Sequence, residues 1–397
     1  MSKVVGALVA VCLSAPVLAQ EQRLTEKASS WIDRNPRHLI RELNNVGFYP
    51  SLGNLGEGAG SGPGLAYFNP NFAGTPIDLH AGAAWSFKGD TTLNLRVGRI
   101  PHVPGGAPSK RRSLEALTSS LADGSNARPF FVYGEVRHQM LANGRLYGSE
   151  ADSAIPFVYK DESYEVVVGY RVAPRLVASV RTGLLEAHAT LDMAPGVSSP
   201  KFVDGPAASG RDLSFLATTG SLAYDHRDQP RDPHSGTFVE ASLARYQQRG
   251  AGSSSFDRFS LDARQYFPLG SERHVLALRG LLAFDSTQGG DTVPFFLERT
   301  LGGSRTLRGY AQYRFRGPKM ATVSAEYRYE VKGPFELAAF YDGGKVWGGL
   351  AEMGTPGFAS SYGVGLRIKS KDDVLIRIDA ARGSEVTRAN LSFGYSF

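Results

Sequence analysis

Residues 301–316 read LGGSRTLRGYAQYRFR, and residues 320–331 read MATVSAEYRYEV. In the second segment apolar and polar residues alternate, which is the period-two pattern of a β-strand with one apolar and one polar face. The first segment lacks this alternation and carries paired glycines and four arginines, so we expect a long cationic loop. The strands that follow offer acidic partners at inward-facing positions, namely Glu326, Asp342 and Asp379. The residues alone leave a solvated surface loop open as the alternative.

Strand patterns extend over most of the chain. From residue 64 onward we count about sixteen segments of roughly ten residues each, the size class of a transmembrane barrel. Alternate connections are short, for example 88–90, 142–144 and 173–174. The connections between them include long segments such as 101–128 and 286–319. This sorting is typical of an outer-membrane barrel with both termini in the periplasm, whereas a soluble sandwich has no reason to sort its loops.

The N-terminus has the three parts of a secretory signal peptide. Lys3 is followed by an apolar run over residues 4–11 and by the small-residue cleavage site VLA at 17–19. After this leader the sequence contains no run of 18 apolar residues, so it predicts no helical membrane span. The single cysteine, Cys12, lies inside the leader, so we expect a mature chain without disulfides or thiolate chemistry.

Three regions are therefore predicted. They are a signal peptide at 1–19, a short periplasmic N-terminal segment with a candidate helix at 20–62, and an outer-membrane β-barrel at 63–397. The predicted fold class is all-β, a transmembrane antiparallel β-barrel of about 16 strands.

Other classes of function find little support. The formal net charge of +6 does not indicate nucleic-acid binding, because basic and acidic residues alternate and the longest basic run is 110–112. The histidines on strands lack the surroundings of a hydrolytic triad, so we expect neither enzymatic activity nor a cofactor. One cluster of possible metal ligands remains, which we interpret as a tight turn without a metal because three turn-forming residues accompany it. Its members are Asp225, His226, Asp228, Asp232 and His234, with Pro230, Pro233 and Gly236.

Five blocks of sequence carry a family resemblance. The first comprises LRGY at 307–310, RFRG at 314–317 and AEYRY at 325–329. The others are YDHRDQPRDPHSG at 224–236, FYDGGKVW at 340–347, YGVGLRI at 362–368 and LSFGYSF at 391–397. Together they resemble the BamA/TamA family of the bacterial surface antigen superfamily, which comprises outer-membrane assembly factors and two-partner secretion transporters. The chain resembles a short form without polypeptide-transport-associated domains, because residues 20–62 are too few for one.

The resemblance implies that the long loop folds into the barrel lumen. Within the loop motif, Arg308 is expected to reach the inward-facing carboxylates of Glu326 and Asp342. The motif consists of Leu307, Arg308, Gly309 and Tyr310.

Two further sets of residues follow from the resemblance. A periplasmic turn motif consists of Asp225, Arg227, Asp228, Pro233 and Gly236. A C-terminal assembly signal consists of Leu391, Phe393, Tyr395 and Phe397.

The resemblance implies a role at the outer membrane of a Gram-negative bacterium, in protein insertion or translocation or in lipid export. The expected partners are outer-membrane lipid, an unfolded outer-membrane or secreted client protein, and a separate periplasmic accessory protein. The alternative is a passive channel or structural barrel without a client. A conductance that is always open would favour the alternative, whereas a closed barrel that accelerates insertion of other barrels would favour the first function.

Overall fold

The computed structural model describes most of the chain. The described residues are 47–55, 60–101, 129–147, 154–192, 212–230, 232–250, 252, 254–271, 273–331, 333–349, 357–369 and 374–393. The chain divides into two units, 1–50 and 51–397, and the account below concerns the second. Within the described ranges, no helix is long and apolar enough to cross a bilayer. The predicted signal peptide and candidate helix lie outside the described residues.

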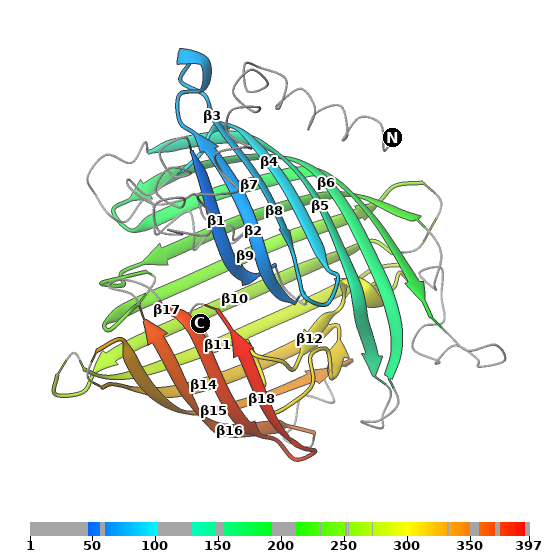
Figure 1. Ribbon diagram of the computed structural model, residues 1–397. Coiled ribbons are helices and arrows are strands. Elements are labelled where there is room, and N and C mark those ends of the chain that lie inside the picture. The colour runs from blue at the N-terminus through cyan, green and yellow to red at the C-terminus, as the bar shows by residue number, and fades with distance from the viewer. Residues whose placement is uncertain are drawn as a thin grey trace, which may run out of the picture. The chain divides into compact units, whose positions relative to one another are not determined.

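Sixteen strands form one antiparallel sheet in which every strand pairs with its neighbours in sequence order (Figure 1). These strands are β1 (Phe48–Asn54), β2 (Ser61–Asn69), β3 (Asp78–Trp85), β4 (Thr91–Arg99), β5 (Phe130–Tyr147), β6 (Ala154–Ala173), β7 (Leu176–Leu191), β8 (Asp212–Asp225), β9 (Gly236–Gln248), β10 (Phe256–Pro268), β11 (His274–Thr287), β14 (Lys319–Glu330), β15 (Phe335–Trp347), β16 (Ala359–Lys369), β17 (Val374–Arg382) and β18 (Thr387–Ser392).

The remaining elements are short. A second sheet pairs β12 (Arg299–Leu301) with β13 (Phe315–Gly317), and single 3-10 turns form η1 (Phe72–Gly74) and η3 (Phe295–Leu297). Figure 1 shows the long strands curving around an interior in which β12 lies. The predicted all-β barrel with a long loop in its lumen is confirmed.

The faces of the strands are reversed with respect to a soluble protein. In β15, Glu336 and Asp342 point inward and are each 1% exposed, whereas Leu337 and Tyr341 point outward and are 49% and 45% exposed. Because a closed ladder satisfies the backbone internally, an apolar outer face and a polar inner face suit lipid outside and water inside. The alternation read from the sequence therefore places the charged side chains of these strands in the lumen.

The structure corrects the predicted strands at two places. Residues 129–141 and 144–150 were expected to be two strands joined by a turn, but β5 is continuous with a register shift between Leu141 and Gly144. Gly144 is needed there because a Cβ would lie 2.5 Å from the ring of Phe157. The chain also has an earlier strand, β1, so the boundary expected at residue 63 falls inside β2.

These corrections change which connections share an end of the barrel. Ile100 at the end of β4 packs with Phe131 of β5 and Val177 of β7, so the connection 101–128 starts and ends beside the β6–β7 turn. We call this the short-turn end, since the turns β6–β7, β8–β9 and β14–β15 lie there. The prediction that grouped 101–128 with the long loops, and 88–90 with the short turns, was wrong because dividing β5 into two strands shifts every earlier connection to the other end.

Candidate functional site: a buried arginine on the lumen loop

The segment between β11 and β14, residues 288–318, is called the lumen loop below. It is ordered by its own short sheet, in which Arg299 pairs with Gly317 and Leu301 with Phe315. Gly302 has a φ of 117°, and a Cβ there would lie 2.0 Å from the carbonyl oxygen of Ala311. Glycine is therefore required at this crossing of two backbones.

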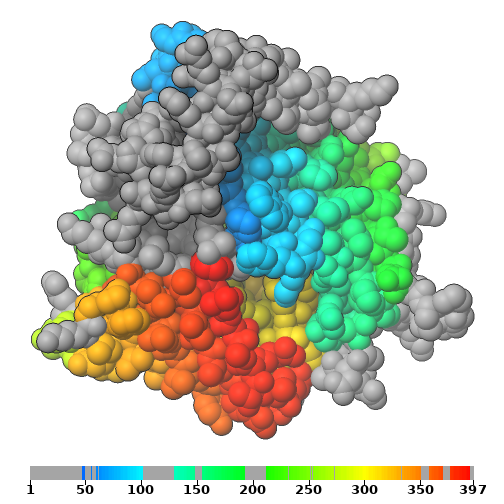
Figure 2. Space-filling view, in the orientation of Figure 1, coloured from blue at the N-terminus to red at the C-terminus, as the bar shows by residue number. Residues whose placement is uncertain are grey.

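One part of the lumen loop packs against the opposite wall of the barrel. The ring of Phe295 lies 5.5 Å from that of Phe157 on β6, and the ring of Phe296 lies 5.4 Å from that of Tyr159. Ring pairs at these separations contribute beyond the area they bury. In the space-filling view, side chains coloured as this segment show between the cyan and the red strands (Figure 2). The loop thus occupies the lumen and is fixed on the side of β6.

Arg308 fixes the loop on the other side. Its Nε and Nη2 donate to the two carboxylate oxygens of Asp342 at 2.8 and 2.7 Å, and its main-chain N–H donates to the same carboxylate at 3.2 Å. Its Nη1 donates to Glu326. The guanidinium carbon lies 3.4 Å from the ring centroid of Phe340. All three charged side chains are at most 2% exposed, so these are desolvated, directional ion pairs.

The strand register explains why both carboxylates meet one arginine. Asp342 is directly opposite Ser324 in the β14–β15 ladder, and Glu326 lies two residues further along the same inward face of β14. The structure therefore brings together the three residues that the sequence linked. Neighbours of Arg308 complete the motif. Leu307 is fully buried, and the hydroxyl of Tyr310 lies 3.0 Å from that of Ser384.

Gly309 allows the tip of the loop to approach the wall. A Cβ at this position would lie 2.5 Å from the main-chain nitrogen of Gly383 and 2.7 Å from the Cβ of Ser361. The carbonyl oxygen of Arg308 accepts a hydrogen bond of 2.9 Å from the side-chain amide of Asn390 on β18. The motif is thus held by β14 to β18 together.

The ionic contacts continue beyond the predicted trio. Arg328 donates a hydrogen bond to Glu326 at 2.9 Å. Arg367 donates to both Glu326, at 3.1 Å, and Asp379, at 2.6 Å. Arg377 lies 3.0 Å from Asp379 and donates to the carbonyl oxygen of Ser304 on the lumen loop at 2.6 Å. The sequence singled out Asp379 but not these arginines, although their inward positions follow from the same alternation.

The two carboxylates that bind Arg308 differ in an important respect. Glu326 also forms ion pairs with Arg328 and Arg367. In the part of the chain that the structure describes, every hydrogen bond and ion pair of the Asp342 carboxylate is made with Arg308. Loss of Arg308 would therefore leave Asp342 as a buried charge without a cation, whereas Glu326 would keep two.

The lumen loop contains one carboxyl group with a displaced pKa. Burial raises the pKa of Glu298 to about 7, and the nearby carboxylate of Asp285 adds to this effect. The guanidinium groups of Arg316 and Arg258 oppose it. Since Glu298 lies between η3 and β12, its ionisation bears on how the loop packs.

The β8–β9 turn is a compact unit. Arg227 donates to Asp225 through Nε at 2.9 Å and Nη2 at 2.7 Å. The Asp228 carboxylate accepts main-chain N–H groups of Gln229, His234 and Ser235 at 2.8, 3.0 and 3.1 Å. Gly236 has a φ of 101°, and a Cβ there would lie 2.0 Å from the carbonyl oxygen of His226, so this position favours glycine. The carbonyl oxygen of Pro233 accepts a hydrogen bond from Arg328 at 3.4 Å.

Comparison with known protein families identifies the class of this barrel. The model of the Omp85 superfamily domain matches residues 157–397, more than half of the chain. The chain belongs to the Omp85 superfamily. Omp85 proteins are β-barrels of the outer membrane of Gram-negative bacteria, so the barrel described above is an outer-membrane barrel.

Solved structures agree with this Omp85 fold. BamA from Haemophilus ducreyi lacking POTRA domains 1–3 superposes with a TM-score of 0.61 at 15% identity, over 88% of this chain and 69% of that one. CdiB from Escherichia coli gives a TM-score of 0.53 at 12% identity, over 88% and 63%. CdiB from Acinetobacter baumannii gives 0.50 at 11% identity, over 88% and 59%. The chain thus spans less than two thirds of either CdiB chain, and these likenesses show the fold alone.

The C-terminal strand of this Omp85 barrel is described only in part. Leu391 points outward and is 63% exposed, while Phe393 is half-buried. Tyr395 and Phe397 lie outside the described residues, so the predicted assembly signal stays a prediction.

Proposed function

We propose that this Omp85 barrel assists the insertion or translocation of an unfolded protein client at the outer membrane, and that the lumen loop must move for it to do so. The observation that supports this most strongly is the buried contact of Arg308 with Asp342 and Glu326. A loop that is fixed on both sides of the lumen is better suited to a barrel that opens when a client binds than to a pore that is always open.

The energy of the contact sets how tightly the barrel is closed. Separating one partner of a buried ion pair costs about 3–5 kcal/mol when the charge left behind stays desolvated. A cost of about 4 kcal/mol would hold the released state to roughly one molecule in a thousand. Binding of a client has to supply a comparable free energy, and we propose that an unfolded chain supplies it.

A passive channel is the competing function. The wall formed by β6 to β9 has a polar cavity of about 190 Å³, lined among others by Ser179, Thr219 and Ser221. This volume accommodates several water molecules, so the cavity is the observation that favours a water-filled path along this wall.

The proposal is tested with the full chain reconstituted in liposomes. A urea-unfolded outer-membrane barrel serves as client, and its insertion is followed by heat-modifiable migration on gels. We expect faster insertion than into empty liposomes, and a slower rate with Arg308→Ala. Arg245→Ala is the matched control, because Arg245 forms an ion pair whose side chains are 50% and 44% exposed.

The remaining outcomes separate the alternatives. No acceleration together with a standing conductance would identify a passive channel and overturn the proposal. Transfer of a fluorescent lipid between leaflets without insertion of the client would identify lipid export instead.

A further inference from the structure

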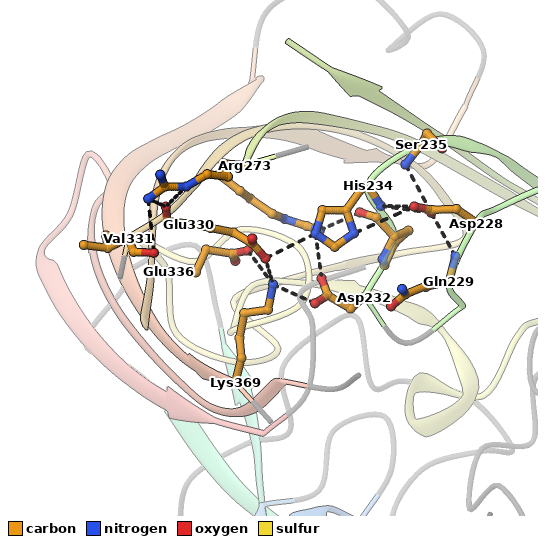
Figure 3. Close-up of polar contacts among 12 residues, drawn as sticks. Asp228, Gln229, Asp232, His234, Ser235, Arg273, Glu330, Val331, Glu336 and Lys369 are labelled. Carbon is orange, nitrogen blue, oxygen red and sulfur yellow. Dashed lines mark hydrogen bonds and ion pairs between the residues drawn. The ribbon is translucent and has the colours of Figure 1, made fainter. Parts of the chain in front are cut away.

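The β8–β9 turn reaches strands that are not its neighbours. In the sheet, β10 and β11 separate β9 from β14. Nevertheless, Nε2 of His234 lies 3.2 Å from Oε1 of Glu330 on β14, and Oδ2 of Asp232 lies 2.6 Å from Nζ of Lys369 on β16. Figure 3 shows these side chains converging from the turn and from the strands. The turn therefore folds inward over the short-turn end of the lumen.

We propose that this convergence is a binding site for a divalent transition-metal ion of the zinc type, with Asp232, His234 and Glu330 as ligands. Each of the three offers one ligand atom, and these atoms lie within 4.8 Å of one another. An imidazole beside carboxylates favours zinc-type ions over magnesium or calcium, which prefer oxygen ligands alone.

The distances suit such an ion. Tetrahedral ligands at about 2.0–2.2 Å from zinc are separated from one another by roughly 3.3–3.5 Å. Nε2 of His234 is 3.2 Å from Glu330 and 3.9 Å from Oδ1 of Asp232. The turn residue Asp232 would have to move toward the other two ligands, whose nitrogen and oxygen atoms already lie at the required separation.

The second ring nitrogen of the histidine lies on the side of a carboxylate. Nδ1 of His234 is 3.8 Å from Oδ2 of Asp228, which is beyond hydrogen-bond distance, and the same carboxylate accepts the main-chain N–H of His234 at 3.0 Å. A histidine that binds a metal through one nitrogen commonly donates the other ring N–H to a carboxylate. Asp228 is the carboxylate within reach of such a bond after a small movement of the ring.

A buried carboxylate beside the cluster is a second observation that bears on ligand binding. Glu336 is 1% exposed, and its Oε1 has no hydrogen-bond partner among the described residues. Its Oε2 lies 3.5 Å from Nζ of Lys369, so the group points into the cluster. An unpaired carboxylate oxygen is costly when buried. Glu336 thus places one buried carboxylate oxygen without a hydrogen bond beside the three proposed ligands.

Cations already lie beside the proposed ligands. Nζ of Lys369 contacts the carboxylates of Asp232, Glu330 and Glu336. The nearby Arg273 donates instead to the main-chain carbonyl of Glu330, through Nε and Nη2 at 3.1 and 2.9 Å. Arg328 donates to Glu326 and to the carbonyl of Pro233. A divalent ion at this site would therefore have to compete with Lys369 for Asp232 and Glu330.

Zinc binding to the folded full chain in detergent tests the site, by isothermal titration with zinc chloride. We expect one equivalent to bind, and magnesium chloride to bind far more weakly. His234→Gln and Glu330→Gln should each weaken binding at least ~10-fold. His226→Gln is the matched control, because His226 lies exposed in the same turn and outside the cluster.

A variant with the opposite expectation keeps the test independent of damage to the fold. Lys369→Gln retains all proposed ligands and removes the competing charge, so it should tighten zinc binding. Heat-modifiable migration verifies that each variant is folded. Absence of zinc binding by the wild type would overturn the proposal and show that these residues form ion pairs only. Equal losses in His226→Gln and His234→Gln, or weaker binding by Lys369→Gln, would overturn it as well.

Discussion

Replacement of Arg308 by alanine probes the buried contact on which the closed state depends. The change removes both guanidinium bonds to Asp342 and the bond to Glu326, but it keeps the main-chain N–H that also points at Asp342. Asp342 is then buried without a cation, which costs about 3–5 kcal/mol if water stays out and much less if water enters. We therefore expect the lumen loop to loosen because water then solvates Asp342.

The asymmetry between the two carboxylates sharpens this prediction. Since Glu326 keeps Arg328 and Arg367, the damage should arise through Asp342. Asp342→Ala should loosen the loop to a similar extent, and the double variant with Arg308→Ala should add nothing further. Combining Arg308→Ala with Glu326→Gln should not restore the loop. Lysine at position 308 should restore it poorly, because an ammonium cannot form the planar fork.

Limited proteolysis of the lumen loop in the folded barrel is the assay, with urea titration of unfolding as a second measure. Cleavage of the loop should become faster in Arg308→Ala while the strands stay protected. Additive effects in the Arg308→Ala/Asp342→Ala double variant would refute the reasoning. An unchanged cleavage rate in Arg308→Ala would show that the arginine contributes no constraint.

The remaining predictions concern other parts of the chain. Gly309→Ala should displace the loop tip and speed its cleavage, because its Cβ would lie 2.5 Å from a backbone nitrogen, whereas Gly349→Ala, with nothing within 4 Å, should not. Burial raises the pKa of Glu298 from 4.5 to about 7, so the folded loop binds the extra proton and should lose protection as pH rises through this window, a dependence that Glu298→Gln should abolish. Deleting Phe397 should slow assembly in a pulse-chase more than it destabilises barrels already formed. Equal assembly rates of the wild type and the truncated chain would instead favour a role of Phe397 in the aromatic girdle at the membrane interface. N-terminal sequencing of the outer-membrane fraction should find Gln20 or a close neighbour first, and an uncleaved soluble protein would contradict the leader.

Much of the loop site was predictable because it rests on period-two alternation. Once 320–331 is identified as a strand with an inward polar face, Glu326 must point into the lumen, and the same reasoning applies to Asp342. The alternation also places Arg328 on β14, Arg367 on β16 and Arg377 on β17 at inward-facing positions. They were overlooked because an arginine on a strand does not by itself indicate a partner.

Other features depended on contacts that local sequence does not encode. Glycine weakens strand patterns, so alternation does not reveal that the glycine-rich region at 53–64 contributes to β1 and β2. The sequence at 142–144 looks like a hairpin turn, yet β5 continues its pairing with β6 after a register shift, and Asp90 accepts the main-chain N–H of Ala142 at 2.9 Å. Likewise, nothing in the turn around His234 indicates that it meets Glu330, which is 96 residues away in the chain.

The most direct test of the central claim is the conductance of the reconstituted barrel in a planar bilayer. We propose that the loop closes the lumen through Arg308, so the wild type should be nearly silent and Arg308→Ala should open frequently and widely. The Arg245→Ala control should behave as the wild type. A large, steady conductance that is the same in the wild type and in Arg308→Ala would contradict a lumen closed by this contact.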